Sequence, residues 1–309
     1  MSDFKTLIVI AGPTAVGKTE LCVRLAGHLE TEIISADSRQ IFREMDIGTA
    51  KPSLAERQAI KHHFIDSHSV ADDYNAGAFE RDALMLLQNS IFQKHQTCLV
   101  AGGSTLYVKI LTDGMDEIPD TDPEIRRRLV EIAGNEGLAP LLAQLDTLDP
   151  AYGQTVDRAN PQRIIRALEV CLSSGQPYSS FRKNQRIQRP FRILKIGLNR
   201  DREELYARIN ARVEQMLAGG LVDEVRRLLP HRHRNALQTV GYSEVFGYLD
   251  GAYGYEEMTS LIQRNTRRYA KRQLTFFGRD TEYRWFHPNQ LTEITDHIGA
   301  ETRQAGLFD

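Results

Sequence analysis

The chain has 309 residues, of which 41% are hydrophobic, and a formal net charge of −2. This composition allows a sizeable core in one or two domains, and the balanced charge excludes a uniformly basic, nucleic-acid-coating protein. Three distant cysteines, Cys22, Cys98 and Cys171, fit buried thiols in a reducing compartment rather than disulfides or a C-x-x-C metal site. No apolar stretch approaches the ~18 residues that span a membrane. We therefore predict a cytoplasmic protein that does not enter a membrane.

The first predicted element is a buried strand over residues 7–11, which leads into a complete G-x-x-x-x-G-K-[ST] loop. The loop reads Gly12-Pro13-Thr14-Ala15-Val16-Gly17-Lys18-Thr19, and a helical leucine pattern follows it. Backbone N–H groups and the helix N-terminus of such a loop bind a diphosphate or triphosphate. Lys18 supplies a cation to the phosphate oxygens, and the Thr19 hydroxyl can ligate Mg²⁺. The loop alone does not say what becomes of the phosphorylated ligand.

Two further strands are predicted before residue 102. The strand over 32–35 places Asp37 at its carboxyl end, and we expect this strand beside that of the phosphate loop. A carboxylate there can hold Mg²⁺ or act as a general base, although an N-cap on a surface turn is an alternative. After a helix over 78–92, a strand over 98–101 runs into Gly102-Gly103-Ser104. Open α/β sheets bind their ligands at such strand ends.

Helical periodicity without strands begins near Asp116 and continues to about residue 192. Asp122-Pro123 and Asn160-Pro161 each pair an N-cap residue with proline at the first helical position. Residues 191–198 resemble a buried strand again, and a long helix is predicted over 255–277. The fold class is therefore α/β: a P-loop NTPase-like parallel-sheet core, residues 1–116 and 193–309, with an all-helical insertion at 117–192.

Ordered segments of the chain together resemble the tRNA dimethylallyltransferases of bacterial type. Any one of them except the phosphate loop is a weak signal, whereas the ordered set is specific. The segments are residues 12–19, 37–42, 45–52, 62–66, 102–104, 160–163, 240–242 and 270–273.

The resemblance implies that the loop binds the diphosphate of dimethylallyl diphosphate. The dimethylallyl group would pass to the N6 amine of the adenosine that follows the anticodon, position 37 of tRNA. This amine is a poor nucleophile because its lone pair is delocalised, so a base must accept its proton, and Asp37 is placed for that role. The loop amides, Lys18, Thr19 and a Mg²⁺ cofactor would stabilise the departing diphosphate.

An arginine in the segment L-x-x-R-I-x-x-R-V is expected to contact the diphosphate. The resemblance implies this role, and the sequence leaves open whether Arg208 or Arg212 fulfils it; spacing alone also fits a solvated helix face. Ser104 stands where the family usually has threonine and keeps the hydroxyl. The predicted catalytic set is Asp37, Lys18, Thr19, Ser104, Arg208 and Arg212.

The resemblance also implies a set of tRNA-contacting residues. They are Asp37, Ser38, Arg39, Gln40, Ser104, Arg126, Gln162, Arg163, Ile164, Ile165, Arg166, Thr239, Val240, Gly241 and Tyr242.

Basic residues gather at 163–166, 182–192 and 264–272 in stretches poor in acids. Each cluster alone fits a solvated face, but three together fit a clamp on an RNA backbone. The expected partner is a tRNA anticodon stem-loop, bound by a monomer, with the target adenosine extruded over Asp37.

Three other functions stay open. A prenyltransferase acting on free AMP, ADP or ATP, as in cytokinin synthesis, would not need a large basic insertion. A small-molecule kinase would use the loop for ATP, but the strand over 98–101 ends in Gly-Gly-Ser rather than in an acid. A non-catalytic RNA-binding protein would tolerate Asp37→Ala, whereas a transferase would lose activity.

Overall fold

The computed structural model describes residues 5–183 and 185–303. The chain forms two compact units, one made of Met1–Thr112 and Arg189–Asp309 and the other of Asp113–Gln188. We call the first the core and the second the helical unit. Among the described residues, none of the helices is long and apolar enough to cross a membrane.

A six-stranded parallel sheet organises the core, in the order β3-β2-β4-β1-β5-β6. This arrangement confirms the predicted α/β fold. The strands are β1 (Thr6–Ala11), β2 (Ile33–Ala36), β3 (His62–His63), β4 (Thr97–Gly102), β5 (Arg192–Leu198) and β6 (Arg284–Phe286). β3 and β6 were not predicted, because two or three residues are too short to show a strand periodicity.

The expected neighbour of the loop strand was wrong. β4 lies between β1 and β2, so the strand that precedes Asp37 does not pair with the strand that precedes the phosphate loop. Asp37 nevertheless comes close to the loop, because the carboxyl ends of parallel strands meet at one edge of the sheet.

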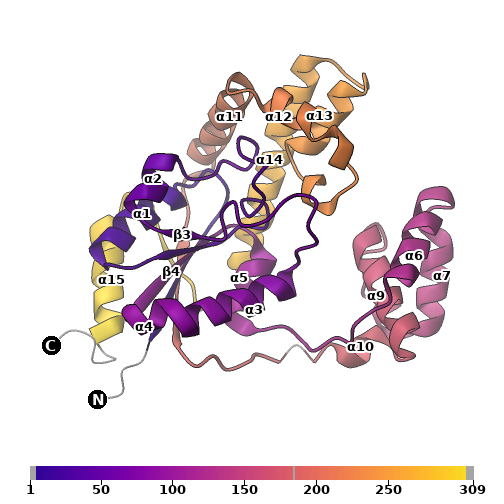
Figure 1. Cartoon of the computed structure of the whole chain (residues 1–309), viewed down its shortest axis with the longest axis horizontal. Helices are drawn as coiled ribbons and strands as arrows, with labels where there is room; N and C mark the ends of the chain where they lie inside the picture. The colour runs from indigo at the N-terminus through magenta and orange to yellow at the C-terminus, as the bar shows by residue number, and fades with distance from the viewer. Residues whose placement is uncertain (1–4, 184, 304–309) are drawn as a thin grey trace. The chain divides into compact units, whose positions relative to one another are not determined.

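Helices cover both faces of this sheet (Figure 1). The helices of the core are α1 (Lys18–His28), α2 (Leu54–Ala59), α3 (Ala76–Leu86), α4 (Phe92–Lys94), α5 (Thr105–Asp113), α11 (Arg202–Ala218), α12 (Leu221–Arg227), α13 (Tyr242–Leu249), α14 (Tyr255–Phe277) and α15 (Leu291–Arg303). α14 has the predicted bounds. The helix predicted over 78–92 is observed as α3, a π-helical turn over Leu87–Ile91, and α4.

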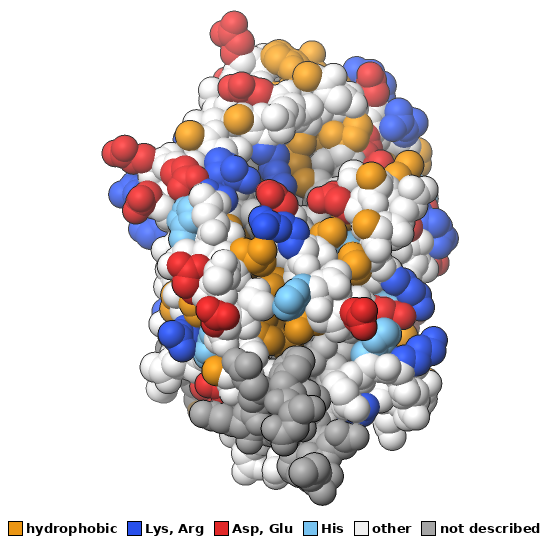
Figure 2. Space-filling view, turned by 90° about the vertical axis from the view of Figure 1, so that its left-hand side faces the viewer, with side chains coloured by type: hydrophobic (Ala, Val, Ile, Leu, Met, Phe, Trp, Pro, Cys, Tyr) orange, Lys and Arg blue, Asp and Glu red, His pale blue; other side chains and the backbone are white. Residues whose placement is uncertain are grey.

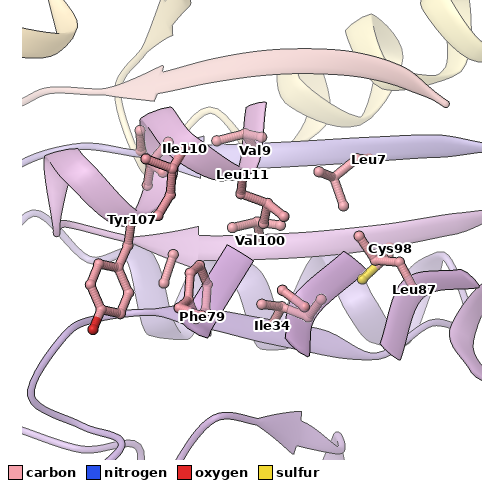
Figure 3. Close-up of a cluster of buried hydrophobic side chains, with 14 of the residues drawn as sticks. Leu7, Val9, Ile34, Phe79, Leu87, Cys98, Val100, Tyr107, Ile110 and Leu111 are labelled. Carbon is pink, nitrogen blue, oxygen red and sulfur yellow. The ribbon is translucent and has the colours of Figure 1, made fainter. Parts of the chain in front are cut away.

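Alternating strand residues supply two apolar layers, one on each face of the sheet. Leu7, Val9 and Val100 pack with α3 and α5 on one face, as Figure 3 shows for part of this cluster. Ile8 and Ile10 pack with α1, α11 and α15 on the other face. A third cluster joins α11, α12, α13 and α14 to the segment around residues 41–45. These three clusters together pack the strands and helices that surround the phosphate loop.

The helical unit has a small core of its own. It contains α6 (Pro123–Asn135), α7 (Ala139–Leu148), α8 (Pro150–Gly153), α9 (Pro161–Ser174) and α10 (Tyr178–Phe181). The side chains of Asp122 and Asn160 cap α6 and α9, as predicted. The unit begins at Asp113 and ends at Gln188, where the sequence predicted 117 and 192. Arg192 already opens β5 and so belongs to the core. A functional division into catalytic core and tRNA-binding insertion stays a prediction.

Candidate functional site

The phosphate loop is held in an unusual backbone conformation. Gly17, the N-cap of α1, has a φ of 108°, which a residue with a side chain rarely adopts. Ala15 has a φ of 63° although it is not a glycine. Such strain persists only where the surroundings hold the backbone in place, and it is common at functional sites.

Lys18 closes the loop on itself. Its Nζ donates hydrogen bonds to the carbonyl oxygens of Gly12 and Pro13, at 2.9 and 2.8 Å. Burial, and secondly the positive charge of Arg212, lower the pKa of Lys18 to about 8, while Asp37 acts in the opposite direction. Burial and the neighbouring cation therefore favour the neutral amine of Lys18. A bound anion would favour the protonated ammonium form instead.

Arginines from two other segments hold the loop from outside. Arg208 Nε donates to the Ala15 carbonyl oxygen at 2.8 Å, next to the strained residue. Arg200 Nε donates to the Val16 carbonyl oxygen, also at 2.8 Å. These bonds turn loop carbonyls outward, which leaves backbone N–H groups for an anion.

Arg212 lies one helical turn after Arg208, and its charge acts on Lys18. Its Nη1 is 3.5 Å from the Thr14 hydroxyl, at the limit of a hydrogen bond. Burial, and secondly the charge of Arg208, lower the pKa of Arg212, and Asp37 opposes this shift. The two predicted arginines thus differ: Arg208 is bonded to the loop backbone, whereas Arg212 is half-buried within the electrostatic reach of both Lys18 and Asp37.

Asp37 lines the same pocket as Lys18 and Thr19, together with Gln40 and Gly103. The Asp37 Oδ1 accepts hydrogen bonds from the backbone N–H groups of Arg39 and Gln40, at 2.9 and 3.3 Å. These bonds fix the direction of the carboxylate, as in an Asx turn. The predicted base and the predicted phosphate ligands therefore come together.

Ser104 joins the ends of β2 and β4. Its Oγ accepts a hydrogen bond from the Ser38 backbone N–H at 2.9 Å and donates to the Ser38 Oγ at 3.1 Å. Its own N–H donates to the Ala36 carbonyl oxygen at 3.3 Å. Tyr269 of α14 lies near enough to Ser104 for this hydroxyl to influence the pKa of the phenol. Ser104 is thus bonded to the residue that follows Asp37, and its predicted catalytic role stays a prediction.

Two tyrosines border Asp37 and Arg39. Burial is the main cause that raises the pKa of Tyr107 and of Tyr269 to about 12, and the charge of Asp37 adds to it. Tyr107 stacks on Phe79 with ring centroids 4.6 Å apart. Figure 3 shows its hydroxyl turned away from the other labelled side chains of that cluster. Both phenols stay protonated at neutral pH and can serve as hydrogen-bond donors.

The predicted tRNA contacts of the helical unit fall into two kinds. The side chains of Gln162 and Arg163 are exposed at the start of α9, whereas Ile164 and Ile165 are buried in the core of the unit. The two isoleucines were predicted as contacts, but burial gives their side chains a packing role, since α9 must bury one apolar face.

Arg126 and Arg166, also predicted contacts, share one acidic partner. Arg126 Nη1 lies 2.7 Å from Glu169 Oε2, and Arg166 Nη1 lies 3.5 Å from Glu169 Oε1. The Glu169 side chain is only 5% exposed. Glu169 therefore binds both arginine side chains, and the sequence analysis did not single out this carboxylate.

The segment 239–242 is largely supporting structure. Tyr242 is fully buried and donates to Glu224 Oε1 at 2.6 Å. Glu224 also accepts the backbone N–H groups of Asp46, Ile47 and Gly48. Thr239 and Val240 are half-buried, so they keep part of their surface available.

The basic clusters are less uniform than the sequence suggested. Arg186, Arg189 and Arg192 pair with acids distant in sequence, namely Asp113, Glu80 and Glu301. The stretch 182–192 contains no acid of its own, as the sequence analysis noted, but the tertiary structure supplies acids to these three arginines. In α14, by contrast, Arg264, Arg268 and Lys271 are exposed.

Acidic and basic side chains are interspersed on the face shown in Figure 2. Among the described residues drawn there, that face presents no large patch of one sign.

A magnesium ion fits the donor set at the loop. The Thr19 hydroxyl and the Asp37 carboxylate line one pocket, and Mg²⁺ in phosphate sites takes one or two protein oxygens together with phosphate oxygens and water. Among residues 5–183 and 185–303, no cluster of three or more His, Cys, Asp or Glu could hold a metal by itself. Ligand phosphates would have to complete the coordination.

Several residues at the site were not singled out from the sequence. They are Tyr107, Arg200, Glu224, Tyr269 and Gln273. Gln273 belongs to one of the segments that carried the resemblance, so a signal existed for it. The others have no local pattern, because their roles depend on partners far away along the chain.

The chain is similar to tRNA-modifying transferases over almost its whole length. The model of the family described as IPP transferase matches residues 40–280. A tRNA dimethylallyltransferase of Cytophaga hutchinsonii is 49% identical over 300 residues, 97% of this chain and 98% of the relative. One of Christiangramia forsetii is 50% identical over 299 residues, 96% and 98% of the two chains. The crystal structure of a tRNA isopentenylpyrophosphate transferase from Bacillus halodurans superposes with a TM-score of 0.72 and 34% identity, covering 97% of each chain. The chain belongs to the IPP transferase family.

Proposed function

We propose that this protein transfers the dimethylallyl group of dimethylallyl diphosphate to the N6 amine of the adenosine that follows the anticodon in tRNA. Its family membership makes it a transferase of the tRNA dimethylallyltransferase kind, which acts on a tRNA adenosine. One observation carries the residue-level proposal: Asp37 lines the same pocket as Lys18 and Thr19 of the phosphate loop. A base and a diphosphate site adjoin, as a displacement at the carbon between them requires.

The donor binds through its diphosphate. Backbone N–H groups of the loop other than that of Thr14, and those of the first turn of α1, are the proposed donors to the phosphate oxygens, and Lys18 adds its charge. Arg212 is our choice for the arginine that contacts the diphosphate, because its Nη1 lies 3.5 Å from the Thr14 hydroxyl of the loop and its charge acts on Lys18. Arg208 instead positions the loop through the Ala15 carbonyl.

The reaction exchanges one bond for another. The N6 nitrogen attacks C1 of the donor, the C1–O bond breaks, and diphosphate leaves with the electron pair. Asp37 accepts the proton that N6 loses. The loop amides, Lys18 and Arg212 stabilise the charge that develops on the diphosphate. Mg²⁺, bound through Thr19 and the phosphates, would add Lewis-acid stabilisation of that charge.

The acceptor is a tRNA anticodon stem-loop, whose target base must leave the stack to reach Asp37. Ser38, Arg39, Gln40 and Ser104 surround this carboxylate and so are the proposed contacts in the core. Arg126, Gln162, Arg163 and Arg166 are the proposed contacts in the helical unit. A cytoplasmic location and a monomeric state stay predictions.

The decisive experiment supplies labelled dimethylallyl diphosphate and Mg²⁺ to three acceptors in parallel: unmodified tRNA with adenosine at the target position, the same tRNA with guanosine there, and free AMP. Label on the adenosine tRNA alone supports the proposal. Label on AMP would indicate a cytokinin-type enzyme. No transfer to any acceptor, together with ATP turnover, would replace the proposal by a kinase.

A further inference from the structure

The buried side chain of Gln273 connects the phosphate loop to the end of β4. The residue lies on α14 and is only 2% exposed. Its Oε1 accepts a hydrogen bond from the backbone N–H of Thr14 in the phosphate loop, at 2.9 Å. Its Nε2 donates to the carbonyl oxygen of Gly103 at the end of β4, at 2.7 Å. The two partners are far apart in the sequence and belong to different strand ends.

The amide of Gln273 fits here because residue 103 is a glycine. A Cβ at that position would lie 2.5 Å from Gln273 Nε2 and 3.5 Å from Lys18 Nζ. The close approach lets the amide, the lysine and the end of β4 occupy one small space. A side chain at residue 103 would therefore push the amide away from the loop.

The contacts continue from Gly103 to the base. The next residue, Ser104, is bonded to the backbone N–H and the hydroxyl of Ser38, which follows Asp37 directly. One turn before Gln273, Tyr269 of the same helix lies near Ser104 and Asp37, which both influence the pKa of its phenol. α14 thus contacts the phosphate loop and the end of β4 through Gln273, and Tyr269 of the same helix lies near the segment that carries Asp37.

We propose that Gln273 is a positioning residue that sets the phosphate loop relative to Asp37, and thereby aligns the diphosphate leaving group with the attacking N6 amine. This inference rests on the proposed transfer reaction. Displacement at C1 needs nucleophile, carbon and leaving oxygen in line, and a misplacement of about 1 Å can cost on the order of a hundredfold in rate.

The side-chain amide has the functional groups that this position requires. It must accept from one backbone N–H and donate to one backbone carbonyl, which only an amide or a protonated carboxylic acid of this length can do. Thr14 N–H is taken up by Gln273, so the diphosphate must use other loop amides. Lys18, Arg200 and Arg208 hold the loop independently. Loss of Gln273 should therefore disturb alignment more than diphosphate binding.

The test compares Gln273→Leu and Gln273→Glu with the wild-type protein. Gln263→Leu serves as the control, because Gln263 lies on the same helix and makes neither bond. Single-turnover transfer to tRNA is measured with both substrates saturating, and the affinity for inorganic diphosphate is measured separately. For Gln273→Leu we expect the transfer rate to fall roughly tenfold to a hundredfold. Its affinity for diphosphate should stay within about threefold of wild type, because the other loop anchors persist.

The pH dependence of Gln273→Glu separates positioning from general structural damage. An ionised carboxylate can accept from Thr14 but repels the Gly103 carbonyl, whereas the protonated acid can donate to it. The ratio of the Gln273→Glu rate to the wild-type rate should therefore rise as the pH falls from 8 to 6. The same ratio for Gln273→Leu should stay flat.

Three results would overturn the inference. They are a normal transfer rate in Gln273→Leu, a fall in rate matched by an equal fall in diphosphate affinity, and parallel pH profiles for the two variants. Failure of the wild-type protein to transfer label to tRNA is a different outcome, because it would refute the proposed function itself.

Discussion

The cations of the phosphate loop and those of the helical unit are held by different kinds of partner. Lys18 and Arg208 donate to backbone carbonyls of the loop, and Arg212 lies near the Thr14 hydroxyl. In the helical unit, Arg126 and Arg166 both contact the Glu169 carboxylate. The first arrangement fixes side chains through neutral oxygens, and the second through a charged group.

This difference decides how much positive charge remains for a ligand. A carbonyl orients a cation without cancelling its charge, so the loop cations repel one another, and this repulsion helps to lower the pKa values of Lys18 and Arg212. A diphosphate relieves that repulsion when it binds. Glu169 instead neutralises the arginines beside it, so a phosphate must compete for them or share them with this carboxylate. Arg163 is exposed on the same helix and has no carboxylate partner among the residues that the structure describes.

Asp37 is the carboxylate that lines the pocket of the loop cations, and its removal should have the largest effect. For Asp37→Ala we expect the single-turnover rate of prenyl transfer to fall about 10²–10⁴-fold, because the base is lost. Binding of tRNA and of diphosphate should persist, since the cations remain. Gel-shift assays check that tRNA binding persists, and rapid-quench assays measure the rate of prenyl transfer. A transfer rate within about tenfold of wild type would assign the proton to another acceptor.

The two arginines of α11 should differ in the next experiment. Arg212→Ala should weaken the binding of inorganic diphosphate by about tenfold to a hundredfold, the usual effect of losing a charged hydrogen bond. Arg208→Ala should weaken it less, because Arg208 acts through the Ala15 carbonyl. Isothermal titration calorimetry compares the variants directly. A larger loss in Arg208→Ala would reverse our assignment.

The sequence predicted the features that depend on neighbouring residues, but not those that depend on residues far apart in the chain. The strand–loop–helix around Gly12 to Thr19 and the bounds of α14 follow from local patterns, and both are observed. The order of the strands is set by long-range pairing, which explains why β4 was not placed between β1 and β2. Likewise, Gln273 belonged to a segment that carried the family resemblance, yet its partners Thr14 and Gly103 could not be deduced from it.

Burial explains the remaining differences at the site. Ile164, Ile165 and Tyr242 lie in segments that resemble tRNA-contacting ones, but their side chains are in apolar clusters. A motif identifies a segment, whereas the helix face that meets solvent depends on what packs against it. The acids that pair with Arg189 and Arg192 were missed for the same reason, since they come from α3 and α15.

The affinity for diphosphate should depend on pH through Lys18. Its pKa is lowered to about 8, so the free protein loses this charge above that pH, while a bound anion favours the ammonium form. Binding above pH 8 therefore requires proton uptake, and the affinity should fall by up to about tenfold per pH unit. Titrations between pH 7 and 9.5 check this.

Lys18→Arg is the matched control, because its guanidinium keeps its charge over this range. The ligand's own ionisation affects both proteins equally and cancels from the comparison. The wild-type affinity should therefore fall more steeply with pH than that of the variant. Identical slopes would show that Lys18 does not titrate in this range.

Glu169→Gln should leave Arg126 and Arg166 beside a neutral oxygen, as the cations of the loop are beside backbone carbonyls. Glutamine keeps the shape of the side chain but removes the charge that neutralises Arg126 and Arg166. If these arginines reach tRNA phosphates, the affinity at low salt should rise a few-fold. The slope of log affinity against log salt should then steepen by about 0.7 for each additional phosphate contact with single-stranded RNA. Filter binding across a salt series measures both quantities.

Asp146→Asn provides the comparison within the same unit. It releases Arg158, which lies 3.0 Å from Asp146 and is not among the predicted contacts. The salt slope of this variant should stay at the wild-type value. If Asp146→Asn and Glu169→Gln change the slope equally, the effect is one of net charge, and Arg126 and Arg166 are not specific phosphate ligands. If only Glu169→Gln changes it, Glu169 limits how strongly Arg126 and Arg166 contact the phosphates of tRNA, whereas Lys18 and Arg208 at the loop are held by backbone carbonyls.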